Sequence, residues 1–220
     1  MNSALAVAAR IATKRLRISG RDLVKTGSRL LLFASSERCW KKTPPCRAIE
    51  SGLQKVMAQN ISPIDPQVRI GHVHLKVADL TRALAFYCGV LGFELKQRYG
   101  REAAFVAAGD YHHHIGLNTW ESEGGTQPPR GTTGLFHLAI VYPTRAALAD
   151  ALKRLIASNV ALDGASDHGV SEALYLRDPD GNGVELYHDR PQSQWPRNAD
   201  GTVAMGVTSL DLQALLIEAN

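Results

Sequence analysis

The stretch Gly183-Val-Glu-Leu-Tyr187 places a single carboxylate, Glu185, among residues that favour β-strands. Side chains alternate between the two faces of a strand, so Glu185 shares a face with the first and last residues of the stretch, and the two aliphatic residues point the other way. A carboxylate on the inner face of a sheet is costly unless a positive partner meets it. We therefore expect Glu185 to contact a metal ion.

Two other strand-like stretches carry a histidine in a similar setting. His72 lies in the run GHVHLKV, and His137 lies in the run LFHLAIV. Two histidines and one carboxylate, with coordination positions left open, form the facial triad of non-haem Fe(II) sites. The sequence therefore predicts a metal centre of His72, His137 and Glu185 that holds Fe(II), with Mn(II) as the alternative ion. His74 shares the face of His72 and is the rival for its place.

The chain repeats one order of elements, strand-helix-strand-strand-strand, in residues 70–118 and 134–188. The predicted strands are Ile70–Val77, Phe93–Tyr99, Ala103–Ala107 and Tyr111–Asn118, and then Phe136–Tyr142, Val160–Leu162, Ala173–Arg177 and Gly183–His188. Asp79 and Thr144 are the expected N-caps of the two helices. A repeat of this size cannot bury its apolar face alone. We therefore predict an α+β fold of two βαβββ modules, whose sheets carry their helices outside and pair around a central metal-binding cup.

Charge is unevenly distributed along the 220 residues, which carry +4 overall. Residues 1–56 carry +9, and the remainder carries −5. The acidic remainder removes the main support for nucleic-acid binding, and the chain has no apolar run long enough to cross a membrane. Three cysteines without paired spacing argue against a disulfide framework.

The domain boundaries follow from these patterns. Residues 1–66 are predicted to be a basic leader outside the fold, residues 67–195 the paired-module domain, and residues 196–220 a tail. The helical stretch of this tail, Leu210–Ala219, is a candidate subunit contact in a homo-oligomer. Two interpretations of the leader stay open: a mitochondrial transit peptide, or sequence upstream of a true start at Met57, in which case we expect a cytoplasmic protein.

Four segments carry a resemblance to a known family, namely Gly71–Asp79, Ala85–Tyr87, Val90–Phe93 and Tyr175–Glu185. They are similar to the vicinal oxygen chelate superfamily, which includes glyoxalase I, fosfomycin-resistance proteins and extradiol ring-cleaving dioxygenases. The resemblance spans Ile70 to about Trp195, and it implies paired βαβββ modules around one divalent metal. The chain most resembles the short catechol 2,3-dioxygenases that have a single module pair.

The resemblance also implies catalytic roles for three residues. His113 matches the histidine that handles oxygen and protons in extradiol enzymes, His168 the histidine that contacts the substrate, and Tyr175 the active-site tyrosine. Imidazoles titrate near neutrality, and a phenol can donate a hydrogen bond to developing negative charge, so these side-chain types suit O₂ attack and ring opening. His112 and His114 flank His113 in the sequence, and we expect them to point away from it and to take no part in the reaction.

The implied activity is that of an Fe(II) extradiol dioxygenase, which inserts O₂ into a catechol-type aromatic ring and gives a 2-hydroxymuconic-semialdehyde-type product. Two other classes stay open. A glyoxalase I-like lyase or isomerase, or a glutathione or thiol transferase, would use the same metal site. It would typically need a second carboxylate in the first module, where Ile115-Gly-Leu117 stands instead. A non-catalytic small-molecule binding module is the third class, and the complete triad argues against it.

Overall fold

The computed structural model describes residues 62–219. The predicted leader therefore lies almost entirely outside the described residues, and the two interpretations of it stay predictions. From Asp65 onward the chain forms one compact unit. Within residues 62–219, every helix is too short or too polar to cross a membrane.

The first module contains four strands and one helical segment. These elements are β1 (Val73–Lys76), α3 (Leu80–Leu84), the π-helical turn η1 (Ala85–Val90), β2 (Glu94–Tyr99), β3 (Ala103–Ala107) and β4 (Ile115–Asn118). The carboxylate of Asp79 accepts hydrogen bonds from the N–H groups of Thr81 and Arg82 and begins the helix, as predicted. The strand order is β1-β4-β3-β2, with β1 and β4 parallel.

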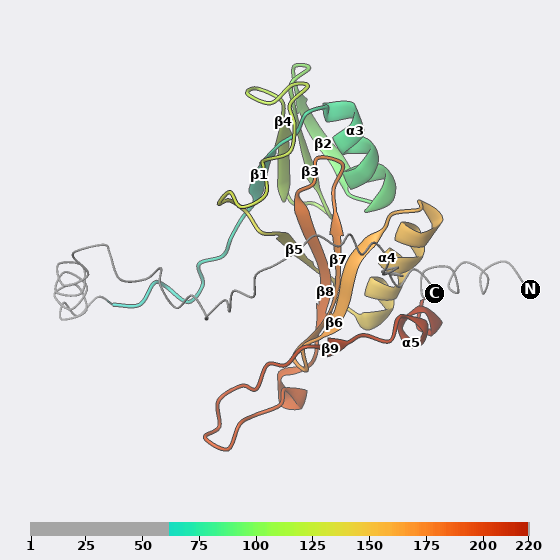
Figure 1. The fold of residues 1–220 in the computed structure, drawn as a ribbon. Helices are drawn as coiled ribbons and strands as arrows, with labels where there is room; N and C mark the ends of the chain where they lie inside the picture. The colour runs from blue at the N-terminus through green and yellow to red at the C-terminus, as the bar shows by residue number, and fades with distance from the viewer. Residues whose placement is uncertain (1–61, 220) are drawn as a thin grey trace, which may run out of the picture. The chain divides into compact units, whose positions relative to one another are not determined.

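The second module repeats this arrangement (Figure 1). Its elements are β5 (Leu138–Val141), α4 (Arg145–Ala157), β6 (Leu162–Asp167), β7 (Ser171–Arg177) and β8 (Gly183–Asp189). The Thr144 hydroxyl caps α4, as predicted. The strand order begins β5-β8-β7-β6, with β5 and β8 parallel. The α+β fold of two βαβββ modules is therefore confirmed.

The three strands beside the candidate histidines begin later than the sequence predicted. β1 begins at Val73, β4 at Ile115 and β5 at Leu138. β4 is shortened because the chain bends at three of the four residues before it, and the ring of His114 accepts a hydrogen bond from the N–H of Ala108 over 3.3 Å. As a result, the candidate residues His72, His113 and His137 all precede strands instead of lying within them. β6 also differs, because it spans Leu162–Asp167 where Val160–Leu162 was predicted.

The apolar core lies between the helices and the sheets and is continuous through both modules. Figure 1 shows α3 and α4 on the same side of their sheets. A buried polar contact joins the modules, since the hydroxyl of Tyr87, which is 0% exposed, donates to Asp178 Oδ2 over 3.0 Å. Burial, and then the Asp178 charge, raise the pKa of Tyr87. Asp180, two residues along the same turn, accepts from the N–H of Ala78. The Asp-Pro-Asp-Gly turn therefore fixes the contact between the modules.

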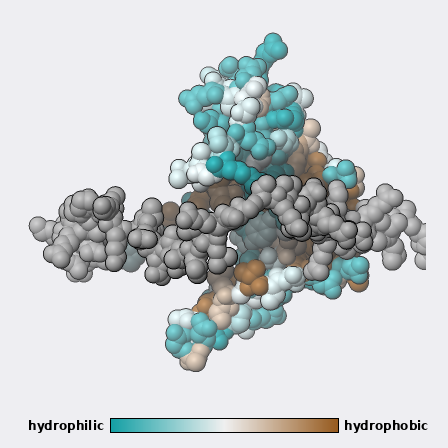
Figure 2. Space-filling view, viewed as in Figure 1, coloured by the Kyte–Doolittle hydropathy of each residue, from teal (hydrophilic) through white to brown (hydrophobic). Residues whose placement is uncertain are grey.

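The C-terminal tail belongs to the second module. It follows η2 (Gln192–Gln194) and contains β9 (Thr208–Ser209) and α5 (Leu212–Ile217). β9 extends the second sheet beyond β6, and α5 packs against α4 with Leu215 fully buried. The loop before β9 exposes the apolar side chains of Met205 and Val207. Figure 2 shows brown and pale patches mixed with hydrophilic ones at this lower end, whereas mainly hydrophilic side chains cover the upper end of the first module.

Candidate metal and catalytic site

Two of the three predicted metal ligands contact each other. His137 Nε2 lies 2.9 Å from Glu185 Oε2, and the two side chains are 31% and 13% exposed. The parallel pairing of β5 with β8 aligns Ala139 with Glu185, which brings the start of β5 beside the carboxylate. Gly183 permits this approach, because a Cβ added there would lie 2.2 Å from the carbonyl oxygen of Phe136 and 3.0 Å from His137 Cβ.

These donors suit a divalent cation. Metal bonds to imidazole nitrogen and carboxylate oxygen are about 2.0–2.2 Å long, so two neighbouring ligands at right angles lie about 3 Å apart. The 2.9 Å between His137 Nε2 and Glu185 Oε2 fits that spacing. The other ring nitrogen, His137 Nδ1, is buried and has no hydrogen-bond partner among residues 62–219. Nε2 is therefore the nitrogen that is directed at the carboxylate and at any ion it holds.

A hydrogen-bonded chain extends from the second oxygen of the same carboxylate. β7 and β8 pair Tyr175 with Glu185, and the Tyr175 hydroxyl lies 3.0 Å from Glu185 Oε1. His168 Nε2 lies 2.8 Å from that hydroxyl, and His168 Nδ1 lies 2.9 Å from the carbonyl oxygen of Gly206 in the tail. The structure therefore brings together four of the six predicted site residues: His137, Glu185, Tyr175 and His168.

The hydrogen atoms available to this chain determine what it can do. A carbonyl oxygen only accepts, so His168 Nδ1 carries a hydrogen and donates it to Gly206. The single hydrogen of Tyr175 has two acceptors beside it, Glu185 Oε1 and the unprotonated Nε2 of a neutral His168. A proton that arrives at Nε2 would let His168 donate to Tyr175 while Tyr175 donates to Glu185. All three hydrogen bonds are then made, so the arrangement suits His168 as a proton acceptor.

The Tyr175 hydroxyl is held in its protonated form. Burial disfavours the phenolate, and the hydrogen bond to Glu185 and the charge of Glu185 act in the same direction. Together they raise the pKa of Tyr175 to about 12. Tyr175 can therefore serve as a hydrogen-bond donor across the neutral pH range.

The remaining two predicted residues lie together in the first module. The rings of His72 and His113 have centroids 4.4 Å apart. Burial lowers the pKa of His113, and the charges of His72 and other neighbouring histidines lower it further. The expectation that His112 points away was wrong, because its Nδ1 lies 2.6 Å from His113 Nδ1. The residues before β4 form a bend, so strand alternation does not apply to them. His114 instead contacts Ala108 and remains a spectator candidate.

His74, the rival ligand, packs against its own sheet. A Cβ added at Gly116 would lie 2.8 Å from the His74 ring, which also contacts Phe105 and Trp120. Burial, and then the charge of His72, lower the pKa of His74. β1 pairs His74 with Gly116 just as β5 pairs Ala139 with Glu185. Gly116 therefore holds the position equivalent to Glu185, and the first module offers no carboxylate there.

In the described part of the chain, no group of three His, Cys, Asp or Glu side chains is arranged to hold a metal ion. His72 contacts His113 of its own module, whereas His137 contacts Glu185. The sequence reasoning also missed two contributors. Gly183 had a visible signal, since a glycine within a strand often marks a close backbone approach. The Gly206 carbonyl had no sequence signal, because every residue has a backbone carbonyl group.

A pocket of about 210 Å³ lies beside the second-module half of the site. Its lining includes the side chains of Phe136, His137, Tyr175 and Arg177. An aromatic ring placed in this pocket would therefore lie next to the His137 imidazole and the Tyr175 phenol.

The chain is similar to several known proteins. Residues 69–186 match the Glyoxalase/Bleomycin resistance protein/Dioxygenase superfamily. A catechol-2,3-dioxygenase from Bacillus subtilis is 42% identical over 160 residues, which are 72% of this chain and 55% of that protein. Biphenyl-2,3-diol 1,2-dioxygenase 3 from Rhodococcus globerulus is 35% identical over 124 residues, covering 55% of this chain and 63% of that protein. A probable lactoylglutathione lyase from Vibrio parahaemolyticus is 29% identical over 130 residues, covering 57% of this chain and 94% of that protein. The chain spans about half to two thirds of the length of the two dioxygenases.

Proposed function

Because the chain belongs to the glyoxalase/bleomycin resistance protein/dioxygenase superfamily, we propose that it is an Fe(II)-dependent extradiol dioxygenase acting on a catechol-type ring. The observation that carries this proposal is the hydrogen-bonded chain from His168 through Tyr175 to Glu185, whose other oxygen meets His137. Ring opening requires proton transfers beside the metal, and this chain supplies groups that can make them. The similarity to two dioxygenases that act on aromatic diols supports the same assignment.

The proposed iron ligands are His72, His137 and Glu185. Two imidazoles and one carboxylate would leave three positions open, two for the oxygens of the diol and one for O₂. When bound, the ion would lower the pKa of the diol and align it with O₂. The product would be a 2-hydroxymuconic-semialdehyde-type compound, with both oxygen atoms of O₂ incorporated and no external reductant.

The chain's own residues would handle protons and orientation. The Tyr175 hydroxyl donates a hydrogen bond to the Glu185 carboxylate. It can redirect that hydrogen bond toward negative charge that develops on the substrate. His168 Nε2 is placed to accept a proton through Tyr175, and Nδ1 stays bonded to Gly206. His113 lies on the first-module side, and its lowered pKa favours the neutral imidazole, the form that can accept a proton.

A lyase or thiol transferase is the second candidate, favoured by the similarity to probable lactoylglutathione lyases. Two observations favour the dioxygenase. Gly116 stands where the first module would supply a carboxylate, and the His74 ring fills the space above Gly116. The His168–Tyr175 pair, in addition, gives the site a proton path that a lyase of this kind does not need.

The two candidates differ in substrate and in O₂ demand. The full chain would be reconstituted with Fe(II) without oxygen and then given catechol, 3-methylcatechol or 2,3-dihydroxybiphenyl in aerated buffer. A dioxygenase gives a yellow ring-opened product from at least one of these diols. Conversion of a glutathione hemithioacetal, with no yellow product from any diol, would replace the proposal with the lyase.

A further inference from the structure

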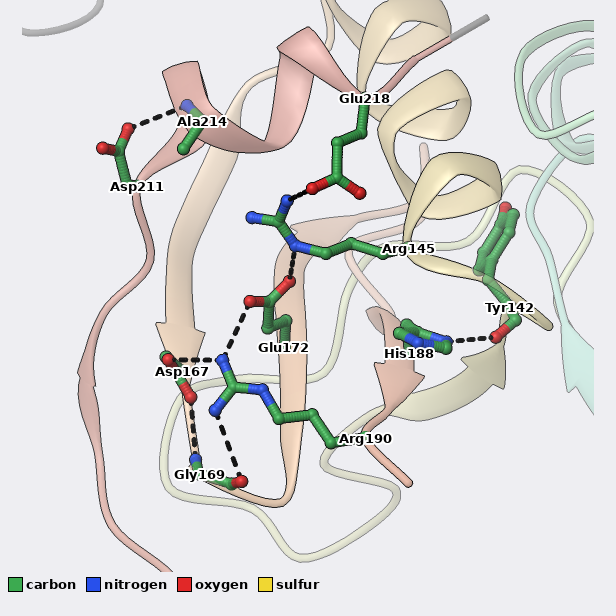
Figure 3. Close-up of polar contacts among 10 residues, drawn as sticks. All are labelled: Tyr142, Arg145, Asp167, Gly169, Glu172, His188, Arg190, Asp211, Ala214 and Glu218. Carbon is green, nitrogen blue, oxygen red and sulfur yellow. Dashed lines mark hydrogen bonds and ion pairs between the residues drawn. The ribbon is translucent and has the colours of Figure 1, made fainter. Parts of the chain in front are cut away.

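Arg190, the residue after β8, makes four contacts around one tight turn. Figure 3 shows the three that its guanidinium makes. Its Nη2 donates to Asp167 Oδ2 over 2.8 Å and to Glu172 Oε1 over 2.9 Å. Its Nη1 donates to the carbonyl oxygen of Gly169 over 3.3 Å, and its backbone N–H donates to the carbonyl oxygen of Val170 over 2.8 Å. The guanidinium therefore holds both ends of the connection between β6 and β7.

This turn carries His168. Within it, Asp167 Oδ1 accepts the N–H of Gly169 over 2.8 Å, and Gly169 adopts a φ of 77° that favours glycine. Burial disfavours the Asp167 carboxylate, but the hydrogen bonds from Arg190 and Gly169 outweigh it and lower its pKa. The ring of His168 projects from the turn between two partners, the Gly206 carbonyl and the Tyr175 hydroxyl. The position of Nε2 therefore depends on where the turn places the backbone of His168, together with these two hydrogen bonds.

The buried carboxylate of Glu172 holds Arg190 in place. Glu172 is 5% exposed and lies between two guanidiniums, with Arg190 on one oxygen and Arg145 of α4 on the other at 2.6 Å. Arg145 also pairs with Glu218 at the end of α5 (Figure 3). Arg145 and Arg190 thus share Glu172, but only Arg190 contacts the turn. This difference provides a matched pair of variants.

We propose that Arg190 is a positioning residue that keeps His168 Nε2 directed at the Tyr175 hydroxyl by holding the β6–β7 turn. Arg190 touches neither the candidate metal ligands nor the pocket, so it acts only through His168. The consequence for turnover rests on the proposed function, whereas the consequence for the His168 ring does not.

The first test compares Arg190→Met with Arg145→Met. Each variant removes one partner of Glu172, so both should lower the midpoint of thermal unfolding by similar amounts. Because small misplacements of a reacting group are costly, Arg190→Met should lower kcat for ring opening by about 10–100-fold, with KM and iron content retained. Arg145→Met should change kcat by less than about twofold, as expected for a residue remote from the turn. Equal losses of kcat in both variants would overturn the proposal.

A second test asks whether the effect passes through His168. Arg190→Met would be introduced into His168→Ala, where no ring remains to be positioned. Residues that act through one another give non-additive effects, so the double variant should turn over like His168→Ala alone. A further loss of the same size as in the wild-type background would show that Arg190 acts elsewhere and would overturn the proposal.

The third test needs neither iron nor substrate, so it separates this proposal from the dioxygenase assignment. Nitrogen-15 spectra of the iron-free full chain at alkaline pH report which ring nitrogen of His168 carries the hydrogen. Wild type and Arg145→Met should show one tautomer, with the hydrogen on Nδ1. In Arg190→Met the two tautomers should average, because the ring is no longer held. A single Nδ1–H tautomer in Arg190→Met would overturn the proposal even if the enzyme opens catechol.

Discussion

The Tyr175 hydroxyl lies 3.0 Å from Glu185 Oε1, between residues that β7 and β8 place directly opposite each other. The other oxygen of the same carboxylate lies 2.9 Å from His137 Nε2. One side chain therefore connects the candidate metal centre to the candidate proton path. Partners of this kind orient a ligand and tune its basicity in metal sites generally.

The three proposed ligands should be individually required for iron. Loss of Glu185 would leave two imidazoles and a doubly charged ion without its neutralising carboxylate. We expect Glu185→Ala, His72→Ala and His137→Ala each to abolish iron retention, measured by elemental analysis after gel filtration. His74→Ala is the matched control and should keep its iron, because the His74 ring packs over Gly116. Full iron occupancy in His72→Ala would remove His72 from the centre.

Gly183 should be required for the approach of His137 to Glu185. A methyl group at this position would collide with the Phe136 carbonyl and crowd His137, so the start of β5 must move away. We expect Gly183→Ala to fold but to weaken iron binding by at least about 10–100-fold, the range seen when ligand support is lost. Gly89→Ala is the control, since an added Cβ there meets nothing within 4 Å. Equal iron affinity in the two variants would argue against the His137–Glu185 pair.

His113 should affect the reaction more than the metal. It contacts His72 through its ring and is proposed to transfer protons. We expect His113→Asn to retain iron and to open the ring about 10²–10⁴-fold more slowly, the usual contribution of general acid–base catalysis. His114→Asn keeps an acceptor for the Ala108 N–H and should lose little. Single-turnover formation of the yellow product measures both, and a fast His113→Asn would contradict the role.

Tyr175 should make the iron-free fold sensitive to alkali. Its pKa is about 12 in the folded chain and about 10 when unfolded, so between these values the unfolded chain releases a proton that the folded chain retains. The stabilising contribution is therefore complete below pH about 10 and is lost as pH rises toward about 12. Urea unfolding at pH about 9 and about 11 should show a larger loss in wild type than in Tyr175→Phe. Equal losses would contradict the raised pKa.

The fold was predictable because its signals are local and repeated. Alternation in β8 placed Glu185 apart from Val184 and Leu186, and both aliphatic side chains are buried. Capping by Asp79 and Thr144 also follows from neighbouring residues alone. β9 escaped prediction because its two residues, Thr208 and Ser209, carry no pattern and become a strand only by pairing with β6.

The site was predictable in part. The meeting of His137 with Glu185 follows from strand pairing, which periodicity indicates. The family resemblance implied separate active-site roles for His168 and Tyr175, but it did not predict the contact between them. The contact between His112 and His113 depends on a bend that strand alternation does not describe. The role assigned to Arg190 arises from contacts between residues 18 and 23 positions apart, and no local pattern indicates such contacts.

The most direct test of the central claim is O₂ uptake by the Fe(II)-reconstituted full chain during catechol turnover, recorded with an oxygen electrode alongside product absorbance. A dioxygenase places both atoms of O₂ in the product, so O₂ and catechol should disappear in equal amounts while the yellow product forms. Glu185→Ala and iron-free wild type should consume none. Absence of O₂ uptake with every catechol tested, in protein shown to contain iron, would contradict the account.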